Sequence, residues 1–323
     1  MIRSSLINVA EILGIRRLVG LLRAWNQYQS IKKLKSRLPS SRAAEFSAYL
    51  TLCQKSYTQP SNKSDWVTKS RDEFNELGFT SIEHPTATQL APQLTARIQE
   101  LEINQPEFWQ NRRCTWKILQ TFPELITVFQ DVIEPFLNDL YQAHFKLFYG
   151  VLEKSIGNDT PRSDGQIWHS DGGPGTCTNL MYYLTESSKE CGALELVPWK
   201  YSLPILKTEV LTNNKQRKLN LATNRKGAPL TRMEHRAVQS ELMTEEIEQN
   251  CSDKIVQPCG PKGLIVPFLN NTLHRGGYPE IDRIRYVFIF HCYPAIDPPP
   301  YNRYLSAGIE KIAGMPASPG DVR

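Results

Sequence analysis

Two histidines and one aspartate in this 323-residue chain have the types and spacing of a metal site. His169 and Asp171 are two residues apart, so in an extended segment their side chains point to the same face. The glycines and proline at 172–175 favour a turn directly after this pair. A second histidine would complete the facial set of two imidazoles and one carboxylate that holds non-haem Fe(II) and leaves positions open. His274 is the best candidate for this third ligand.

The surroundings of His274 strengthen a weak HxD signal. A short apolar run, 264–269, leads up to His274, and two glycines follow it. The next predicted strand carries Arg283 and Arg285, and a guanidinium matches a carboxylate with two charge-assisted hydrogen bonds. Because side chains alternate along a strand, geometry alone does not choose between these two arginines. Together these features favour metal binding over an ordinary histidine.

Three spaced segments resemble one enzyme family. They are His169-Ser170-Asp171, the segment GALELVP at 192–198, and His274 followed eleven residues later by Arg285. With these segments the chain resembles the phytanoyl-CoA dioxygenase-like branch of the Fe(II)/2-oxoglutarate-dependent oxygenases, over roughly residues 72–294. The resemblance implies a double-stranded β-helix, a jelly-roll relative of the cupins.

The resemblance also implies a reaction. Fe(II), 2-oxoglutarate and O2 would be used to hydroxylate a small organic or lipid-like substrate, with release of succinate and CO2. The family spacing selects Arg285 for the distal carboxylate of 2-oxoglutarate. Related halogenases have a small residue at the carboxylate position, so the presence of Asp171 favours an oxygenase.

Three further residues are candidates for the same site. Tyr182, on the strand after the metal loop, could donate its hydroxyl to the cosubstrate, although buried strand tyrosines are more often core residues. Gln166 and Trp168 flank the metal loop and are predicted to line the substrate cavity. The remaining histidines have no neighbours at ligand spacing and are interpreted as structural: His84, His144, His235 and His291.

Composition restricts the class of protein. With 40% hydrophobic residues and no repeats, the chain has enough apolar residues for a globular core. The seven cysteines are scattered and never in a CxxC pair, which argues against a disulfide scaffold or a zinc ribbon and for a reducing, cytoplasmic compartment. Nucleic-acid binding has little support, because no recognisable module accompanies the basic residues.

The basic residues are concentrated in residues 1–42. Nine Lys or Arg and one acid give this stretch a charge of +8, so the rest of the +5 chain is about −3. Apolar residues recur there at near-helical spacing, but no run reaches the roughly 18 residues needed to span a bilayer. A basic amphipathic helix can lie on an anionic membrane surface or dock on an acidic partner, and it can equally pack on the enzyme's own body.

The predicted organisation is α+β, mainly β with helical cover. Residues 1–64 are predicted to form a helical extension, and 65–323 the catalytic domain with N-terminal helices around a jelly-roll core. A helix ending at Gly78 and a short strand should open this domain. Further helices are predicted over 86–101 and 113–137, and short strands over 145–152, 176–185, 194–197, 255–257, 264–268 and 284–291.

The polar stretch 200–253 is too long for an ordinary connection inside a barrel. We expect it to cover the active site as a lid, with a helix around 238–249; surface decoration is the alternative. Two other functions also remain open. One is a cupin-like metal enzyme that does not use 2-oxoglutarate, which Arg285 argues against. The other is a non-catalytic binding or membrane-associated member of the fold, which the intact ligand set argues against.

Overall fold

The computed structural model describes residues 50–60, 63–109, 113–114, 118–158, 164–171, 177–207, 243–299 and 301. The basic stretch 1–42, the turn at 172–175 and the middle of the predicted lid lie outside these residues, so the predictions for them stay predictions. No helix among the described residues is long and apolar enough to cross a membrane.

Helices dominate the first part of the described chain, as the sequence predicts. The helix predicted over 113–137 is corrected at its start, because Arg113–Cys114 pairs as strand β1 and the helices of this region begin at Ile118. Gly78 ends α4 in the left-handed conformation, with φ of 82°, and its N–H donates to Phe74 O at 2.7 Å. His84 begins α5, because its Nδ1 accepts from Thr86 N and Pro85 follows at the first position. The helices are α4 (Asp65–Leu77), α5 (Pro85–Asn104), α6 (Ile118–Thr121), α7 (Leu125–Val128), a π-helical turn (Phe129–Ile133), α8 (Glu134–Tyr141) and α9 (Trp199–Lys207).

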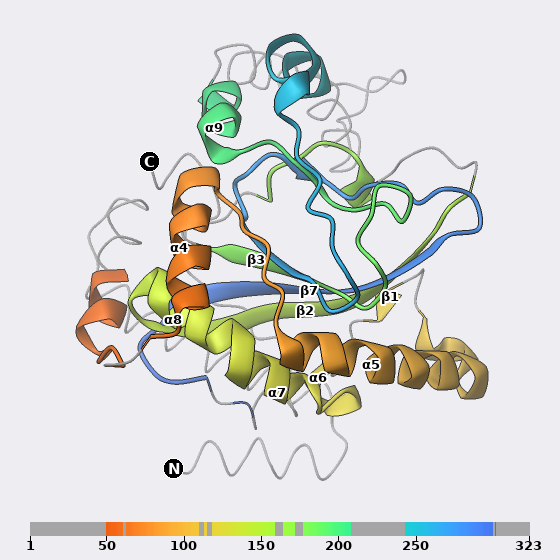
Figure 1. Ribbon diagram of the computed structural model, residues 1–323, viewed down its shortest axis with the longest axis horizontal. Helices are drawn as coiled ribbons and strands as arrows, with labels where there is room; N and C mark the ends of the chain where they lie inside the picture. The colour runs from red at the N-terminus through yellow and green to blue at the C-terminus, as the bar shows by residue number, and fades with distance from the viewer. Residues whose placement is uncertain are drawn as a thin grey trace, which may run out of the picture.

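Five antiparallel strands form the main sheet, in the order β1-β2-β7-β3-β5 (Figure 1). Phe79 and Ile82 bridge to β5, which confirms the predicted short strand after Gly78. The five strands are β1 (Arg113–Cys114), β2 (His144–Ile156), β3 (Thr178–Tyr183), β5 (Ile265–Leu269) and β7 (Ile284–Ala295).

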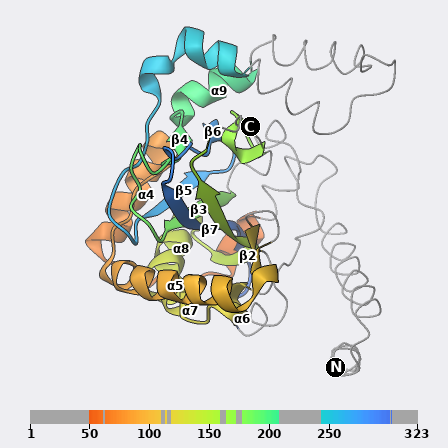
Figure 2. The same cartoon turned by 90° about the vertical axis from the view of Figure 1, so that its right-hand side faces the viewer.

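A smaller sheet lies on the other side of the main sheet from α5, α6 and α7 (Figure 2). Its two strands, β4 (Glu195–Leu196) and β6 (His274–Arg275), pair antiparallel, and bridges add His169 next to β6 and Val256 next to β4. Figure 2 shows α5, α6 and α7 beneath the main sheet and β4 and β6 above it. Two antiparallel sheets with helices over one outer face confirm the predicted double-stranded β-helix.

The alternation of β7 divides its side chains between two cores. Tyr286, Phe288 and Phe290 pack in the large cluster beneath the helices, as predicted. Val287 and Ile289 belong instead to a cluster between the sheets. Strand β7 therefore carries Arg285 on the face that points between the two sheets.

The described ends of the predicted lid are both helical. Residues 243–250 form a helix, whereas the sequence placed it around 238–249, and the part before 243 lies outside the described residues. Ile205 of α9 and Ile247 of this helix are buried in one apolar cluster. Figure 1 shows the two helices side by side at the top of the molecule.

The described end of the predicted extension packs on the rest of the chain. Cys53 is buried in the large core cluster, and Gln54 Nε2 donates to Tyr141 O at 3.1 Å. Residues 50–60 thus pack on the domain that was predicted to begin at 65.

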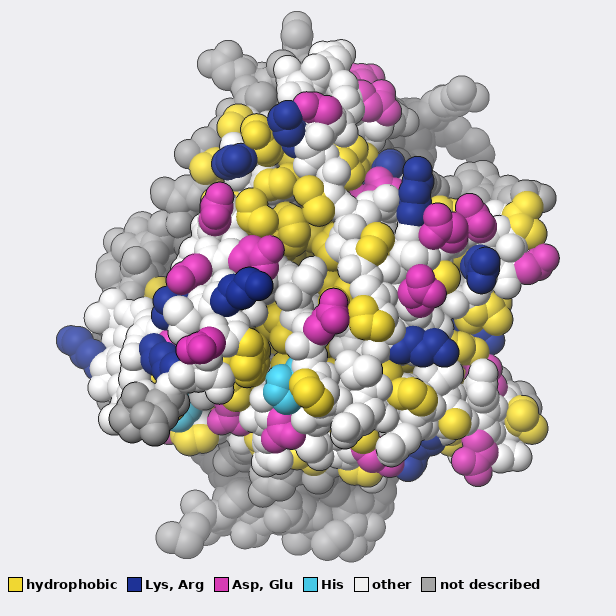
Figure 3. Space-filling model, viewed as in Figure 1, with side chains coloured by type: hydrophobic (Ala, Val, Ile, Leu, Met, Phe, Trp, Pro, Cys, Tyr) yellow, Lys and Arg dark blue, Asp and Glu magenta, His cyan; other side chains and the backbone are white. Residues whose placement is uncertain are grey.

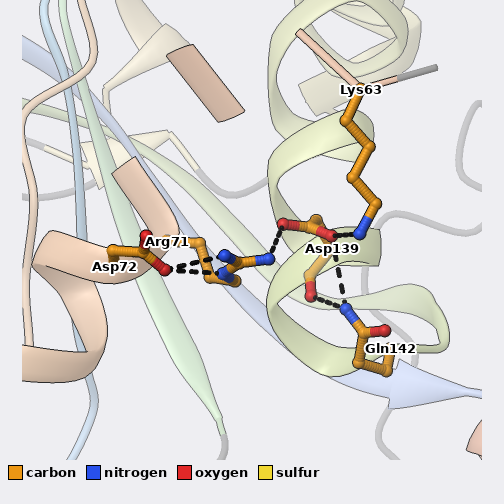
Figure 4. A network of polar contacts seen from close by, with 5 residues as sticks. All are labelled: Lys63, Arg71, Asp72, Asp139 and Gln142. Atoms are coloured by element: carbon orange, nitrogen blue, oxygen red, sulfur yellow. Dashed lines mark hydrogen bonds and ion pairs between the residues drawn. The ribbon is translucent and has the colours of Figure 1, made fainter. Parts of the chain in front are cut away.

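A polar network ties the start of α4 to α8 (Figure 4). Asp139, whose side chain is 4% exposed, pairs with Lys63 and with Arg71 Nη1 at 2.9 Å. Gln142 Nε2 donates to the same carboxylate at 3.3 Å. Arg71 also binds the exposed Asp72 at 2.7 Å. Because Asp139 is buried and both cations can still reach solvent, its carboxylate is the central group of this network.

We expect Asp139→Asn to lower the free energy of unfolding by about 1–3 kcal/mol, because a buried charge-assisted acceptor is replaced by an amide. The matched control is Asp72→Asn, which changes the partly exposed contact of the same arginine and should cost less than about 0.5 kcal/mol. Urea unfolding of both variants measures the difference. Equal losses would mean that the Asp139 network does not stabilise the fold.

Charges on the visible surface are mixed. On the face seen in Figure 3, basic and acidic side chains of the described residues lie interspersed, and neither sign forms a continuous area. This face therefore gives no indication of an extended basic binding surface.

Candidate metal centre

Backbone pairing brings the two histidines together. His169 and His274 bridge antiparallel strands, and each backbone N–H donates to the other residue's carbonyl at 3.0 Å. Asp171 N donates to Asn270 O at 3.1 Å, which places the aspartate beside the loop that leads to His274. Directly opposed side chains on one face of a bridge lie close, so the imidazoles and the carboxylate converge.

The ligand atoms are arranged for a shared ion. The available donor atoms of His169, Asp171 and His274 all lie within 4.8 Å of one another. His169 Nε2 is 3.5 Å from Asp171 Oδ1, and His274 Nε2 is 3.6 Å from Asp171 Oδ2. These separations are too long for strong hydrogen bonds, and they leave all three atoms facing one point.

The second ring nitrogens fix the tautomers. His169 Nδ1 lies 2.7 Å from Ile167 O, and His274 Nδ1 lies 2.7 Å from Thr272 O. Since a carbonyl oxygen can only accept, each Nδ1 carries the hydrogen and each Nε2 keeps its lone pair toward Asp171. This donor set fits a divalent cation such as Fe(II).

Asp171 is held as a carboxylate. Removal from water on its own would raise the pKa of Asp171, but the electrostatic effect of the neighbouring His274, His169 and His291 rings, together with the hydrogen bond from Asn179, lowers this pKa below its usual range. Asn179 Nδ2 donates to Asp171 Oδ2, so an amide orients the third ligand. An ionised, oriented carboxylate is the form that binds a metal.

The three residues face a cavity of about 220 Å³ between the two sheets, and Arg285 lines the same cavity. Its lining combines five apolar side chains, Val151, Met181, Leu194, Phe268 and Ile289, with seven polar ones, among them the three proposed ligands and Arg285. The volume is below the roughly 300–1,000 Å³ of typical small-molecule sites. It therefore suits a small cosubstrate better than a large substrate.

Arg285 is 1% exposed, and its guanidinium is held from three sides. Nη1 donates to Gly192 O and, at 3.3 Å, to Gly277 O, while Nη2 donates to Ser155 Oγ at 3.1 Å. Nη2 also lies 3.9 Å from Glu153 Oε1. The Nε–H is buried and has no acceptor in the described part of the chain. The side chain is thus fixed in place with hydrogen-bonding capacity left over.

Arg283, the other candidate for this role, is excluded by position. It precedes β7 and is exposed, whereas Arg285 is inside. Of the two arginines, only Arg285 lines the cavity.

The orientation of Tyr182 corrects its prediction. Its hydroxyl donates to Ala87 O at 2.7 Å, and its ring packs in the core beneath the helices. Asn179 and Met181, on the opposite face of β3, line the cavity instead. We therefore remove Tyr182 from the cosubstrate site.

The two residues predicted to contact substrate do not line the cavity either. Trp168 is 2% exposed and packs in the cluster with Ile205 and Ile247, on the other side of its strand from His169. Gln166 is buried next to a cavity residue, with Cγ 3.9 Å from where a Cβ on Gly276 would lie. Trp168 therefore occupies a packing position, whereas the predicted substrate contact of Gln166 stays a prediction.

Sequence reasoning missed three polar cavity residues: Glu153, Asn179 and His291. His291 was interpreted as structural, but it lines the cavity, and burial lowers its pKa. The period of two from Arg285 through Ile289 could have found it. Of the other histidines, His84 caps α5 and His144 packs edge-on to Tyr57, while His235 lies outside the described residues.

No protein-family model and no curated protein matches the chain. Solved structures do share its fold. The crystal structure of EctD from S. alaskensis with bound Fe has a TM-score of 0.50 and 15% sequence identity, and the match covers 75% of this chain and 83% of that one. The non-heme alpha ketoglutarate dependent carbocyclase SnoK from nogalamycin biosynthesis also has a TM-score of 0.50 and 15% identity, over 74% of this chain and 87% of that one. The chain therefore has the fold of an iron-binding EctD structure and of an alpha ketoglutarate dependent carbocyclase.

Proposed function

We propose that the chain is an Fe(II)/2-oxoglutarate-dependent dioxygenase, of the phytanoyl-CoA dioxygenase-like kind. One observation carries the proposal: His169, Asp171 and His274 converge at one end of a cavity that a buried arginine, Arg285, also lines. A metal site next to a buried cation is suited to a ligand that is both chelating and anionic. The fold shared with SnoK agrees with this function.

The residues have separate roles in this proposal. The two Nε2 atoms and the Asp171 carboxylate would hold Fe(II), which with 2-oxoglutarate and O2 would supply oxidation of a substrate C–H bond, yielding succinate and CO2. Asn179 orients the Asp171 carboxylate through its amide. Arg285 would orient 2-oxoglutarate through its distal carboxylate. The apolar side chains of the lining, including Met181, Leu194 and Ile289, would keep water away from the reacting atoms.

The substrate is proposed to be a small organic or lipid-like molecule. Five apolar side chains line the cavity, beside the three proposed metal ligands, Arg285 and three further polar residues, Glu153, Asn179 and His291. A substrate with an apolar reacting segment fits such walls because its burial removes apolar surface from water.

One observation favours a different metal enzyme. Both Nη atoms of Arg285 already bind protein groups, Gly192, Gly277 and Ser155, so this arginine could serve only to join strands. A cupin-like enzyme without 2-oxoglutarate would then remain. The buried Nε–H, which finds no acceptor among the described residues, argues against a purely structural arginine.

The direct test is an anaerobic titration with Fe(II) and then 2-oxoglutarate, followed by O2 and assay of succinate. We expect a visible charge-transfer band only when Fe(II) and 2-oxoglutarate are both bound. Succinate should form after O2 is added. Metal binding without the band and without succinate would favour the cupin-like alternative.

A further inference from the structure

An apolar cluster lies on the far side of the two histidine ligands. We call it the rear cluster, and its buried members are Trp168, Val197, Ile205, Ile247, Cys251 and Leu273. Trp168 directly precedes His169, and Leu273 directly precedes His274. Since neighbouring residues in extended chain point to opposite faces, the rear cluster lies opposite the metal ligands.

The two described ends of the 200–253 insertion supply the other half of the rear cluster. Ile205 comes from α9 and Ile247 from the helix at 243–250, and they are 4% and 0% exposed. The residues that precede both ligands therefore pack on the insertion. Close-packed interiors transmit displacements, because a neighbour cannot move without opening a void.

A hydrogen-bonded link joins α9 to the segment before His274. Leu273 N donates to Ser202 Oγ at 3.0 Å, and Ser202 Oγ donates to Val197 O at 2.6 Å. Leu273 O in turn accepts from Val197 N at 2.9 Å. Ser202 is 0% exposed, so this hydroxyl has no water to replace it. The position of Leu273 is thus fixed from the insertion side.

An arginine connects the two histidine segments on this side. Arg275, the residue after His274, places Cζ 4.6 Å from the centroid of the Trp168 ring. Its Nε donates to Glu195 Oε2 at 2.6 Å, across the β4–β6 pair. The planar guanidinium stacks on the Trp168 ring and pairs with Glu195. It therefore restrains Trp168 relative to the strand of His274.

We propose that Ser202, Ile247 and Arg275 are positioning residues for the metal centre, through which the insertion is energetically coupled to metal binding. This inference rests on the proposed metal site, but not on 2-oxoglutarate or on turnover. Coupling between two sites is reciprocal. The metal must therefore stabilise the ends of the insertion by the same amount as the insertion strengthens metal binding.

The test uses Co(II) alone as the probe, with its visible absorption as the signal. Ser202→Ala removes the hydroxyl that binds Leu273 N, and we expect Co(II) affinity to fall by about 2- to 30-fold, the usual range of such couplings. The matched control is Ser187→Ala: Ser187 is 1% exposed, and its hydroxyl donates to Pro258 O at 2.8 Å, away from the rear cluster. This control should keep the wild-type affinity.

A second pair separates positioning from general destabilisation. Ile247→Val and Ile98→Val each remove one methylene from a fully buried isoleucine, the first in the rear cluster and the second in the large core. Both should lower the melting temperature, but only Ile247→Val should weaken Co(II) binding. Arg275→Lys keeps a charge near Glu195 but loses the planar stacking on Trp168. This variant should also bind Co(II) more weakly than the wild type.

The reciprocal effect can be measured in the wild-type protein without any variant. Saturating Co(II) should slow amide hydrogen exchange in 243–250 and in α9, relative to α5. Wild-type exchange that Co(II) leaves unchanged there, or rear-cluster variants that bind Co(II) like wild type, would overturn the coupling alone. A wild-type protein that does not bind Co(II) would overturn the metal centre and this inference together.

Discussion

His274→Ala should abolish turnover and weaken Co(II) or Fe(II) binding by more than about a hundredfold. Residues that only support a ligand typically contribute about 10- to 100-fold to metal affinity, so loss of a ligand should exceed that range. His169→Ala and Asp171→Ala should behave alike, because all three donor atoms face one point within 4.8 Å. Metal titration followed by absorbance, together with a thermal melt, measures both properties.

The matched control is His144→Ala. This histidine packs against Tyr57 with ring centroids 5.0 Å apart and belongs to no metal-ligating group found among the described residues. Its loss should reduce stability while metal affinity stays at the wild-type value. Unchanged affinity in all three ligand variants would contradict the assignment of the metal centre.

The metal ligands could be predicted because their chemistry is visible in residue types and spacing. Two local patterns indicate the metal site without any knowledge of long-range contacts. One is an HxD pair in an extended segment, and the other is a histidine followed by glycines and then by a strand that carries an arginine. The strands β2, β5 and β7 could be predicted for a similar reason, since each is a bulky apolar run. What the sequence lacks is the pairing that joins His169 to His274, more than a hundred residues away.

Tyr182 shows where periodicity fails. All six residues of β3 are buried, so no polar face marks which side points at the cavity. The register with β7 sets Asn179 opposite His291 on the cavity side and leaves Tyr182 with the helices. Fully buried strands have two apolar faces, and only tertiary packing assigns them.

The prediction that Trp168 contacts substrate was wrong for the complementary reason. Trp168 was predicted to contact substrate because it is next to the ligand His169 in sequence. Side chains alternate along an extended segment, however, so Trp168 lies on the opposite face of the strand from His169. Its partners, Ile205 and Ile247, come from an insertion whose packing no local pattern predicts. The same alternation that made His169 and Asp171 recognisable therefore excluded their neighbour from the cavity.

Arg285→Lys should raise the Kd for 2-oxoglutarate by about tenfold to a hundredfold while metal affinity stays near wild type. Lysine keeps the charge but loses the planar fork, and a charge-assisted hydrogen bond contributes roughly 1.5–3 kcal/mol. The buried Nε–H, for which the described part of the chain offers no acceptor, is the donor that lysine cannot supply. Binding of 2-oxoglutarate to the Co(II)-loaded protein measures this effect apart from turnover.

Arg283→Lys is the matched control, because it makes the same change two residues away on an exposed side chain outside the cavity. It should leave the Kd for 2-oxoglutarate within about twofold, as surface substitutions change free energies by less than about 0.5 kcal/mol. A melting curve of each variant separates loss of binding from loss of fold, since Arg285 also binds Gly277 O and Ser155 Oγ. If both variants bind 2-oxoglutarate equally well, Arg285 joins strands only. The cupin-like enzyme then becomes the better account of this cavity.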